Sequence, residues 1–184
     1  MHKQLSLQIK QKKGLAHITE LVYALGQFLS IRLLPNHGPG KVAKMFFSFP
    51  IYLYKAGLGG LIGSKLLLLT TVGRKSGRYR TTPLGYITGE EGVFYITAGW
   101  KGSSNWYKNV KTNPEVQVQV GSIKFHCHAE ELKIEDQVQV LANFSKHYPI
   151  VIRTYKWMAR MPFDGSDGFF RRIAEEGPML VLRE

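Results

Sequence analysis

Between residues 65 and 131 the chain reads as a succession of short strands separated by glycine-bearing turns. The apolar run KLLLLTTV is typical of a buried strand, and VQVQV alternates as a half-buried strand does. Strands this closely spaced are joined by tight turns, so they pair with antiparallel neighbours. The pattern predicts a small barrel with strands at 65–72, 80–88, 93–98, 116–120 and 123–131.

Helical patterns flank and interrupt this strand-rich middle. Ser103 or Ser104 is expected to cap a short helix that runs to Thr112. Pro83 places its strand at an edge or a bulge of the sheet, because proline cannot donate a ladder hydrogen bond. The order of elements predicts an α+β fold in which helices pack on the barrel. The remaining expected elements are helices at 15–34, 135–160 (interrupted at 149) and 169–174, and a last strand at 179–182.

The excess positive charge lies in the first part of the chain. The 184 residues carry 25 Lys and Arg against 13 Asp and Glu, a net charge of +12. Up to residue 80 there are 13 basic residues and one acid, Glu20, whereas the rest of the chain is balanced. Such a block attracts an anionic partner: a multiply charged ligand, a membrane surface or nucleic acid. A single cysteine, Cys127, excludes a disulfide scaffold, and the ordinary apolar content excludes a disordered chain.

Residues 15–34 form an amphipathic segment that is not expected to span a membrane. Their apolar members recur every three or four positions, but His17, Glu20 and Arg32 interrupt them, and a span needs about 20 predominantly apolar residues. No signal-peptide cleavage pattern follows. Two interpretations stay open, with the first favoured: the apolar stripe packs on the protein, or it lies on the inner face of the cell membrane, helped by the preceding lysines. We expect a cytoplasmic protein in both cases.

A glycine-bracketed turn carries four basic side chains, those of Arg74, Lys75, Arg78 and Arg80. Glycine lets a backbone approach a ligand closely, and successive N–H groups in a turn bind anions. Arginine adds a two-pronged donor for phosphate or carboxylate. The GxxxxGK[ST] spacing of a P-loop is absent. The turn is therefore either an anion cradle between two strands or an exposed basic hairpin, and composition alone weighs the two equally.

Two tryptophans and a tyrosine gather beside glycines in residues 98–109. Backbone donors at a glycine-opened strand end suit the polar edge of a planar ligand, and Trp100, Trp106 and Tyr107 offer aromatic faces to cover it. The alternative is a helix that packs Trp106 into the core, which is favoured for this residue taken alone.

Together these segments resemble the deazaflavin-dependent nitroreductase family. The resemblance rests on LLTTVGRKSGRYRTTPL at 68–84, WYKNVKTNP at 106–114 and VQVQVG at 116–121. It extends over about residues 48–131, nearly half of the chain. Each stretch is common by itself, whereas the combination is specific.

The resemblance implies a split, FMN-binding-like β-barrel of about six mostly antiparallel strands in residues 41–184, preceded by a basic tail and helix in residues 1–40. It also implies a homodimeric oxidoreductase that passes a hydride from reduced coenzyme F-420, a deazaflavin whose tail carries a phosphodiester and glutamates. An FMN-dependent enzyme, or a carrier of the coenzyme, is the alternative on the same fold. The implied coenzyme-binding residues are Arg74, Lys75, Ser76 and Arg80 for the phosphate and acidic tail, Pro83 and Leu84 for the pocket wall, and Ala98, Gly99, Trp100, Lys101, Gly102, Trp106 and Tyr107 for the ring.

The resemblance also describes the electron acceptor: a small or lipophilic, electron-poor molecule such as a quinone, an enone, a nitro compound or an unsaturated lipid. The nitro-drug-reducing members have a serine after the strand alanine and a longer loop before the WY pair. This chain lacks both, which argues against nitroimidazole reduction. Tyr148 and Tyr155 are the candidate catalytic proton donors, with His147 as a third.

Two further signals are weaker. His126 and His128 share one face of their strand and Cys127 faces the other way, so two ligands are available where a structural zinc takes four. No metal site is expected. The rival of another class is a non-catalytic basic module that binds nucleic acid or a membrane surface, but no nucleic-acid-binding motif supports it.

Overall fold

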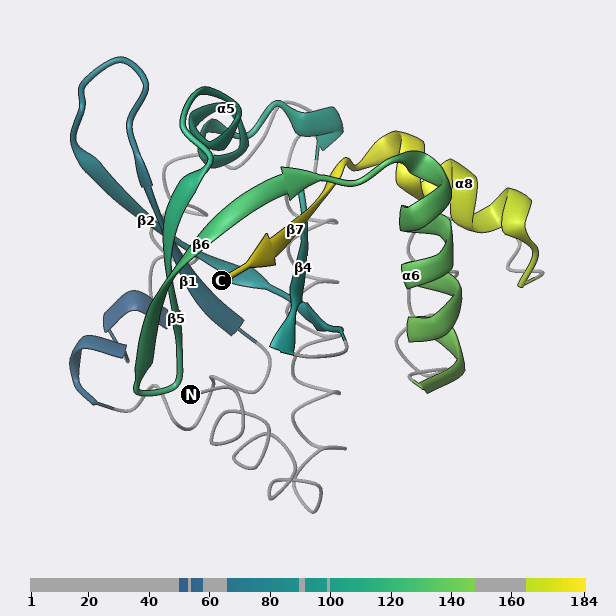
Figure 1. The fold of residues 1–184 in the computed structure, drawn as a ribbon, viewed down its shortest axis with the longest axis horizontal. Helices are drawn as coiled ribbons and strands as arrows, with labels where there is room; N and C mark the ends of the chain where they lie inside the picture. Colours follow the sequence, from purple (N-terminus) through teal and green to yellow (C-terminus); the bar gives the residue numbers. More distant parts are fainter. Residues whose placement is uncertain (1–49, 53, 58–65, 90–91, 99, 148–164) are drawn as a thin grey trace.

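The computed structural model describes residues 50–52, 54–57, 66–89, 92–98, 100–147 and 165–184. Within them, seven strands form one antiparallel sheet in the order β2-β1-β5-β6-β7-β4-β3 (Figure 1). The strands are β1 (Leu66–Val72), β2 (Tyr79–Gly85), β3 (Ile87–Thr88), β4 (Phe94–Thr97), β5 (Glu115–Val120), β6 (Ile123–Glu131) and β7 (Met179–Arg183). The helices include η3 (Trp100–Gly102), α5 (Asn105–Thr112), α6 (Ile134–His147) and α8 (Asp167–Glu176).

The sheet curls because its two edges belong to one stretch of chain. β2 lies at one edge beside β1, and β3 lies at the other edge beside β4. Tyr86 alone separates β2 from β3, so the first and last strands of the sheet are consecutive. The Tyr86 ring packs edge-on against Phe94 of β4, with 5.3 Å between the ring centroids. The result is a barrel-like sheet in which Pro83 lies on an edge strand, as its residue type predicts.

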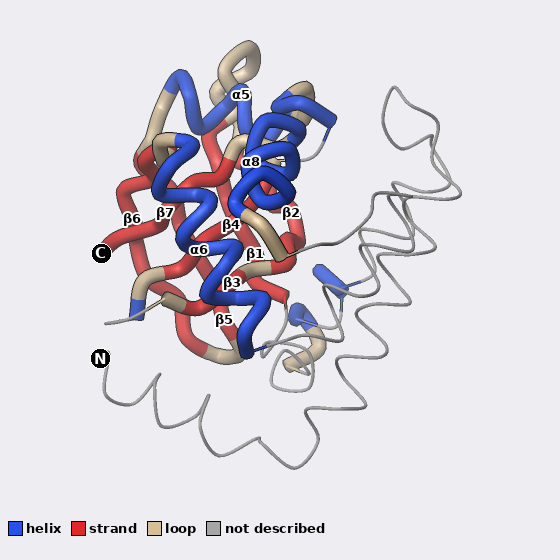
Figure 2. Tube along the Cα trace, turned by 90° about the vertical axis from the view of Figure 1, so that its right-hand side faces the viewer, coloured by secondary structure: helices blue, strands red, loops and turns tan. Residues whose placement is uncertain are grey.

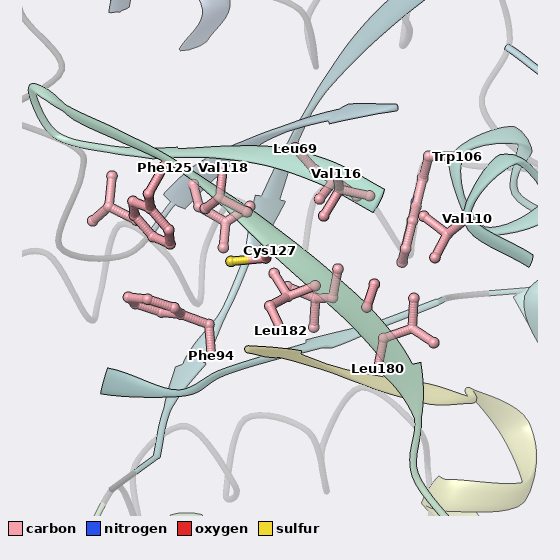
Figure 3. Close-up of a cluster of buried hydrophobic side chains, with 14 of the residues drawn as sticks. Leu69, Phe94, Trp106, Val110, Val116, Val118, Phe125, Cys127, Leu180 and Leu182 are labelled. Carbon is pink, nitrogen blue, oxygen red and sulfur yellow. The ribbon is translucent and has the colours of Figure 1, made fainter. Parts of the chain in front are cut away.

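Alternate side chains of the strands fill the inside of the curl (Figure 3). Leu67 and Leu69 of β1 and Val118 of β5 are completely buried there. Helix α5 adds Trp106 and Val110 to the same cluster. Along β5 and most of β6, buried residues alternate with half-buried or exposed ones, as a sheet with one apolar face requires.

A second apolar layer lies between the sheet and the helices α6 and α8, which lie along one side of the sheet (Figure 2). Phe169 and Phe170 of α8 pack there with Met179 of β7. The neighbouring Leu180 and Leu182 point into the inner cluster instead. Strand β7 is therefore buried on both faces, in the middle of the sheet.

The α+β class, the antiparallel sheet and the individual strand predictions are confirmed. Two details differ: the strand predicted at 80–88 is divided into β2 and β3, and Ser104 occupies the N-cap position of α5 without making a side-chain capping hydrogen bond. The predicted helix at 15–34, the division after residue 40 and the helix beyond residue 147 lie outside the described residues. No helix in the described part of the chain is long and apolar enough to cross a membrane.

Candidate functional site: a cationic hairpin on helix α5

The turn between β1 and β2 has a compact shape that requires glycine at two positions. The N–H of Gly77 donates to the carbonyl of Gly73 at 2.7 Å, and the N–H of Gly73 donates to the carbonyl of Arg78 at 2.9 Å. Gly77 has a φ of +63°, in the left-handed region. A Cβ on Gly73 would lie 2.9 Å from Oγ of Ser76 and 3.1 Å from the Arg78 carbonyl oxygen. The sequence GRKSG thus fixes where the basic side chains of the turn begin.

In the described part of the chain, no ion pair joins the basic side chains of this turn to an acidic residue. Arg74, Lys75, Arg78 and Arg80 are all exposed. From residue 50 to residue 114, the described residues include no aspartate or glutamate. Lys75, Arg78 and Arg80 make no side-chain hydrogen bond or ion pair with any residue that the structure describes. An anion that approaches the turn would therefore meet basic side chains that form no ion pair with the described residues.

Arg74 differs from the other three because its guanidinium is held by helix α5. Its Nη1 donates to Oδ1 of Asn109 at 3.1 Å and to the backbone carbonyl of Asn105 at 3.3 Å. Its Nη2 donates to Oδ1 of Asn105 at 3.3 Å. These acceptors are neutral oxygens, so they orient the guanidinium without cancelling its charge.

The other residues expected around the anionic tail lie close to this arrangement. Oγ of Ser76 accepts from the N–H of Arg78 at 3.5 Å, and the stem of Arg80 passes beside Gly73. Ser76 therefore shapes the turn, and the structure brings Arg74, Lys75, Ser76 and Arg80 together on one hairpin.

Pro83 and Leu84 do not line one face of β2. Pro83 is paired with Leu68 and Leu84 with Leu67, so the two side chains point to opposite sides of the sheet. Leu84 packs on the inner cluster. Since successive residues of a strand alternate between faces, Pro83 and Leu84 would meet a ligand from different sides of the edge strand β2.

The loop after β4 is held by contacts with residues 176–178. The N–H of the buried Ala98 donates to the carbonyl of Pro178 at 2.8 Å, so this donor is not free to meet a ring, contrary to the sequence expectation. Gly102 is buried with a φ of +71°, and a Cβ there would lie 2.9 Å from the Tyr107 ring. Lys101 is exposed, has a φ of 52° and pairs with Glu176 at 3.3 Å. Gly99 and the side chain of Trp100 lie outside the described residues.

Trp106 and Tyr107 are neighbours with different surroundings. Trp106 is 8% exposed and belongs to the inner cluster, in agreement with the expectation that a helix packs it into the core. Tyr107 is half-buried, and its hydroxyl donates to Oε2 of Glu131 at 2.8 Å. Nζ of Lys111 donates to the same Glu131 oxygen at 2.7 Å. Burial and the Glu131 carboxylate raise the pKa of Tyr107 to about 12. Its proton is therefore held towards Glu131, and Tyr107 is a poor acid at neutral pH.

Tyr148 and Tyr155 lie outside the described residues. Nδ1 of His147, at the end of α6, lies 2.9 Å from the carbonyl of Asn143 and donates to it. His126 and His128 are exposed on the outer face of β6, and Nδ1 of His128 lies 2.6 Å from Oε1 of Glu115. In the part of the chain that the structure describes, no group of three metal-ligating side chains gathers.

Sequence reasoning gave no individual role to the residues that hold the hairpin. Asn109 is only 5% exposed and joins Arg74 to Thr71, whose hydroxyl accepts from Nδ2 of Asn109 at 3.2 Å. The one available signal was the spacing of Asn105 and Asn109 by four residues, which places both side chains on the same face of a helix. The sequence alone did not indicate that this face of the helix contacts the basic turn.

Comparison with known proteins identifies a family that matches this chain. The family model described as F420H(2)-dependent quinone reductase matches residues 52–157. An F420H(2)-dependent quinone reductase of Mycobacterium tuberculosis (strain ATCC 25618 / H37Rv) is 36% identical over 44% of this chain and 59% of its own length. Among solved structures, that of an F420-H2 dependent reductase, FDR-A, is 25% identical and covers 65% of this chain and 94% of that chain, with a TM-score of 0.44.

A curled antiparallel sheet with a cationic turn at one edge defines a barrel suited to an anionic ligand. Since the matched segment takes in more than half of the chain and includes the hairpin, α5, β5 and β6, the chain belongs to the F420H(2)-dependent quinone reductase family. This confirms the resemblance to deazaflavin-dependent reductases. The chain spans about three fifths of the length of the curated relatives that it matches.

Proposed function

We propose that the protein is an oxidoreductase that uses reduced coenzyme F-420 to reduce a quinone or a similar electron-poor, lipophilic acceptor. The observation that carries the proposal is the cationic hairpin: four exposed basic residues on a rigid turn, without an acid among the described residues from 50 to 114. A phosphodiester followed by carboxylates is opposite in charge to such a surface. Membership of the family supports the same coenzyme.

The residues of the hairpin fit the anionic tail of this coenzyme. Arg74 is oriented by α5 and presents an uncancelled guanidinium, while Lys75 and Arg80 remain free to move towards further charges. The N–H groups of Gly73, Arg74 and Gly77 are already used in hydrogen bonds within the protein, so the exposed basic side chains of the turn, and not its backbone, would bind the anion. In this proposal these residues bind and orient, and the tail anchors the ring at the nearby sheet edge.

The bound coenzyme would supply the hydride chemistry from its deazaflavin ring. The protein would hold the ring beside the loop at residues 100–102, whose course is fixed by the close packing of the buried Gly102 on Tyr107 and Pro178. Because Tyr107 keeps its proton towards Glu131, we assign it a supporting role and leave Tyr148 and Tyr155 as the proposed proton donors. Pro83, on the outer face of β2, is the remaining candidate for the pocket wall.

The wider setting belongs to the same proposal. We place the enzyme in the cytoplasm as a homodimer, with residues 15–34 packed on the barrel or resting on the membrane surface. A membrane contact would bring the site close to lipophilic quinones, and the lysines ahead of this segment would favour an anionic surface.

Coenzyme oxidation in the presence of a quinone tests the proposal. We expect the purified protein to accelerate the re-oxidation of reduced coenzyme F-420 by a soluble quinone such as menadione, with saturation in both reactants. A nitroimidazole should be reduced much more slowly, because the serine and the longer loop of nitro-drug-reducing relatives are missing. If the protein binds the coenzyme but accelerates its oxidation with none of the quinones and enones tested, the reductase function is excluded and a coenzyme-carrier function remains.

A further inference from the structure

We infer that Asn109 is a positioning residue for anion binding: it fixes the Arg74 guanidinium through a neutral oxygen and so keeps its full charge available to the ligand. The inference rests on the proposed function, since the ligand meant is the anionic tail of the coenzyme. It gives Asn109 a role in the affinity of the site in addition to its place in the fold.

Three contacts of one buried amide carry the argument. Oδ1 of Asn109 accepts from the backbone N–H of Arg74 at 3.2 Å and from Nη1 of the same residue at 3.1 Å. Nδ2 of Asn109 donates to the hydroxyl of Thr71 at 3.2 Å. Asn109 is thus tied to the end of strand β1 and to the basic turn at once, and its side chain is buried.

The neutrality of the acceptor is the decisive feature. An aspartate in the same position would offer the same oxygen to Arg74, and the Thr71 hydroxyl can turn to donate to it by giving up its long 3.5 Å hydrogen bond to the Arg80 carbonyl. The geometry would survive, but the carboxylate would neutralise the guanidinium at hydrogen-bond distance. Fold stability alone would therefore favour aspartate or be indifferent to it, whereas anion binding requires the amide.

Asn109→Asp is the test, because it separates these two demands. We expect the variant to keep or raise the melting temperature and to bind oxidised coenzyme F-420 at least tenfold more weakly. Asn143→Asp on the exposed surface of α6 changes the net charge equally and should bind like the unsubstituted protein. Equal affinity of Asn109→Asp and the unsubstituted protein would overturn the inference, and so would an equal loss in Asn143→Asp.

Two additions keep the result decisive. Should Asn109→Asp fail to fold, Asn105→Asp serves instead, because its exposed side chain contacts Nη2 of Arg74 at 3.3 Å; we expect a loss of about threefold or more, and no loss would overturn the inference. Inorganic tripolyphosphate is the second probe. If the unsubstituted protein binds tripolyphosphate but not the coenzyme, the proposed function fails. The inference about Asn109 is then tested by the affinity for tripolyphosphate, which should be at least tenfold weaker in Asn109→Asp. Absence of binding to both would overturn the inference as well.

Discussion

Replacing Arg74 and Lys75 together by alanine should weaken the binding of coenzyme F-420 by a factor of at least about 100. Each side chain would donate charge-assisted hydrogen bonds to phosphate or carboxylate, which contribute about 1.5–3 kcal/mol apiece, and about 2.7 kcal/mol corresponds to a factor of 100. Arg78 and Arg80 remain in the variant, so some affinity should persist. A fluorescence titration of the oxidised coenzyme at fixed ionic strength measures the change.

The matched control removes two positive charges elsewhere. Lys146 on α6 and Arg172 on α8 are exposed and lie well away from the hairpin, on the helical side of the molecule (Figure 1). Their double alanine variant should keep its affinity within about twofold, since long-range attraction is screened at physiological salt. Similar losses in both double variants would mean that net charge, and not the hairpin, attracts the coenzyme.

The largest effect on stability is expected at Leu182. This side chain is 1% exposed in the central strand β7 and packs inside the curl with Phe94 and Phe125 in the same cluster (Figure 3). Leu182→Ala should lower the free energy of unfolding by about 2–5 kcal/mol, because it removes buried apolar surface and leaves a cavity. Denaturant unfolding followed by circular dichroism measures the loss.

The adjacent Arg183 provides the comparison within the same strand. Its Nη1 pairs with Oε2 of Glu130 at 2.7 Å, but both side chains are exposed. Arg183→Ala should therefore change the free energy of unfolding by no more than about 1 kcal/mol. A loss at Leu182 as small as the loss at Arg183 would contradict the placement of β7 between β6 and β4.

The regular part of the fold was predictable because local patterns decide it. The period-two alternation at 116–120 and 123–131 predicts strands with one buried face, and the structure has β5 and β6 there. The position of β7 was not predictable in this way. Its four apolar residues predict a buried strand. Its place between β6 and β4, however, depends on pairing with strands that lie far away in the sequence.

The candidate site shows the same division. The cluster of basic residues and the need for glycine at positions 73 and 77 could be predicted from residue types alone. The contact between the turn and α5 could not, since Arg74 and Asn109 are 35 positions apart and meet only when the sheet has curled. For the same reason the free N–H expected at Ala98 is occupied, by a carbonyl eighty residues later in the chain, that of Pro178.

Direct titration of the purified protein with oxidised coenzyme F-420, and separately with FMN, tests the central claim that the hairpin holds the acidic tail of the deazaflavin. We predict micromolar or tighter binding of the deazaflavin, much weaker binding of FMN, and an affinity for the deazaflavin that falls steeply with salt concentration, because several charges meet in the complex. Equal or tighter binding of FMN would contradict the account, as would an affinity for the deazaflavin that does not depend on salt.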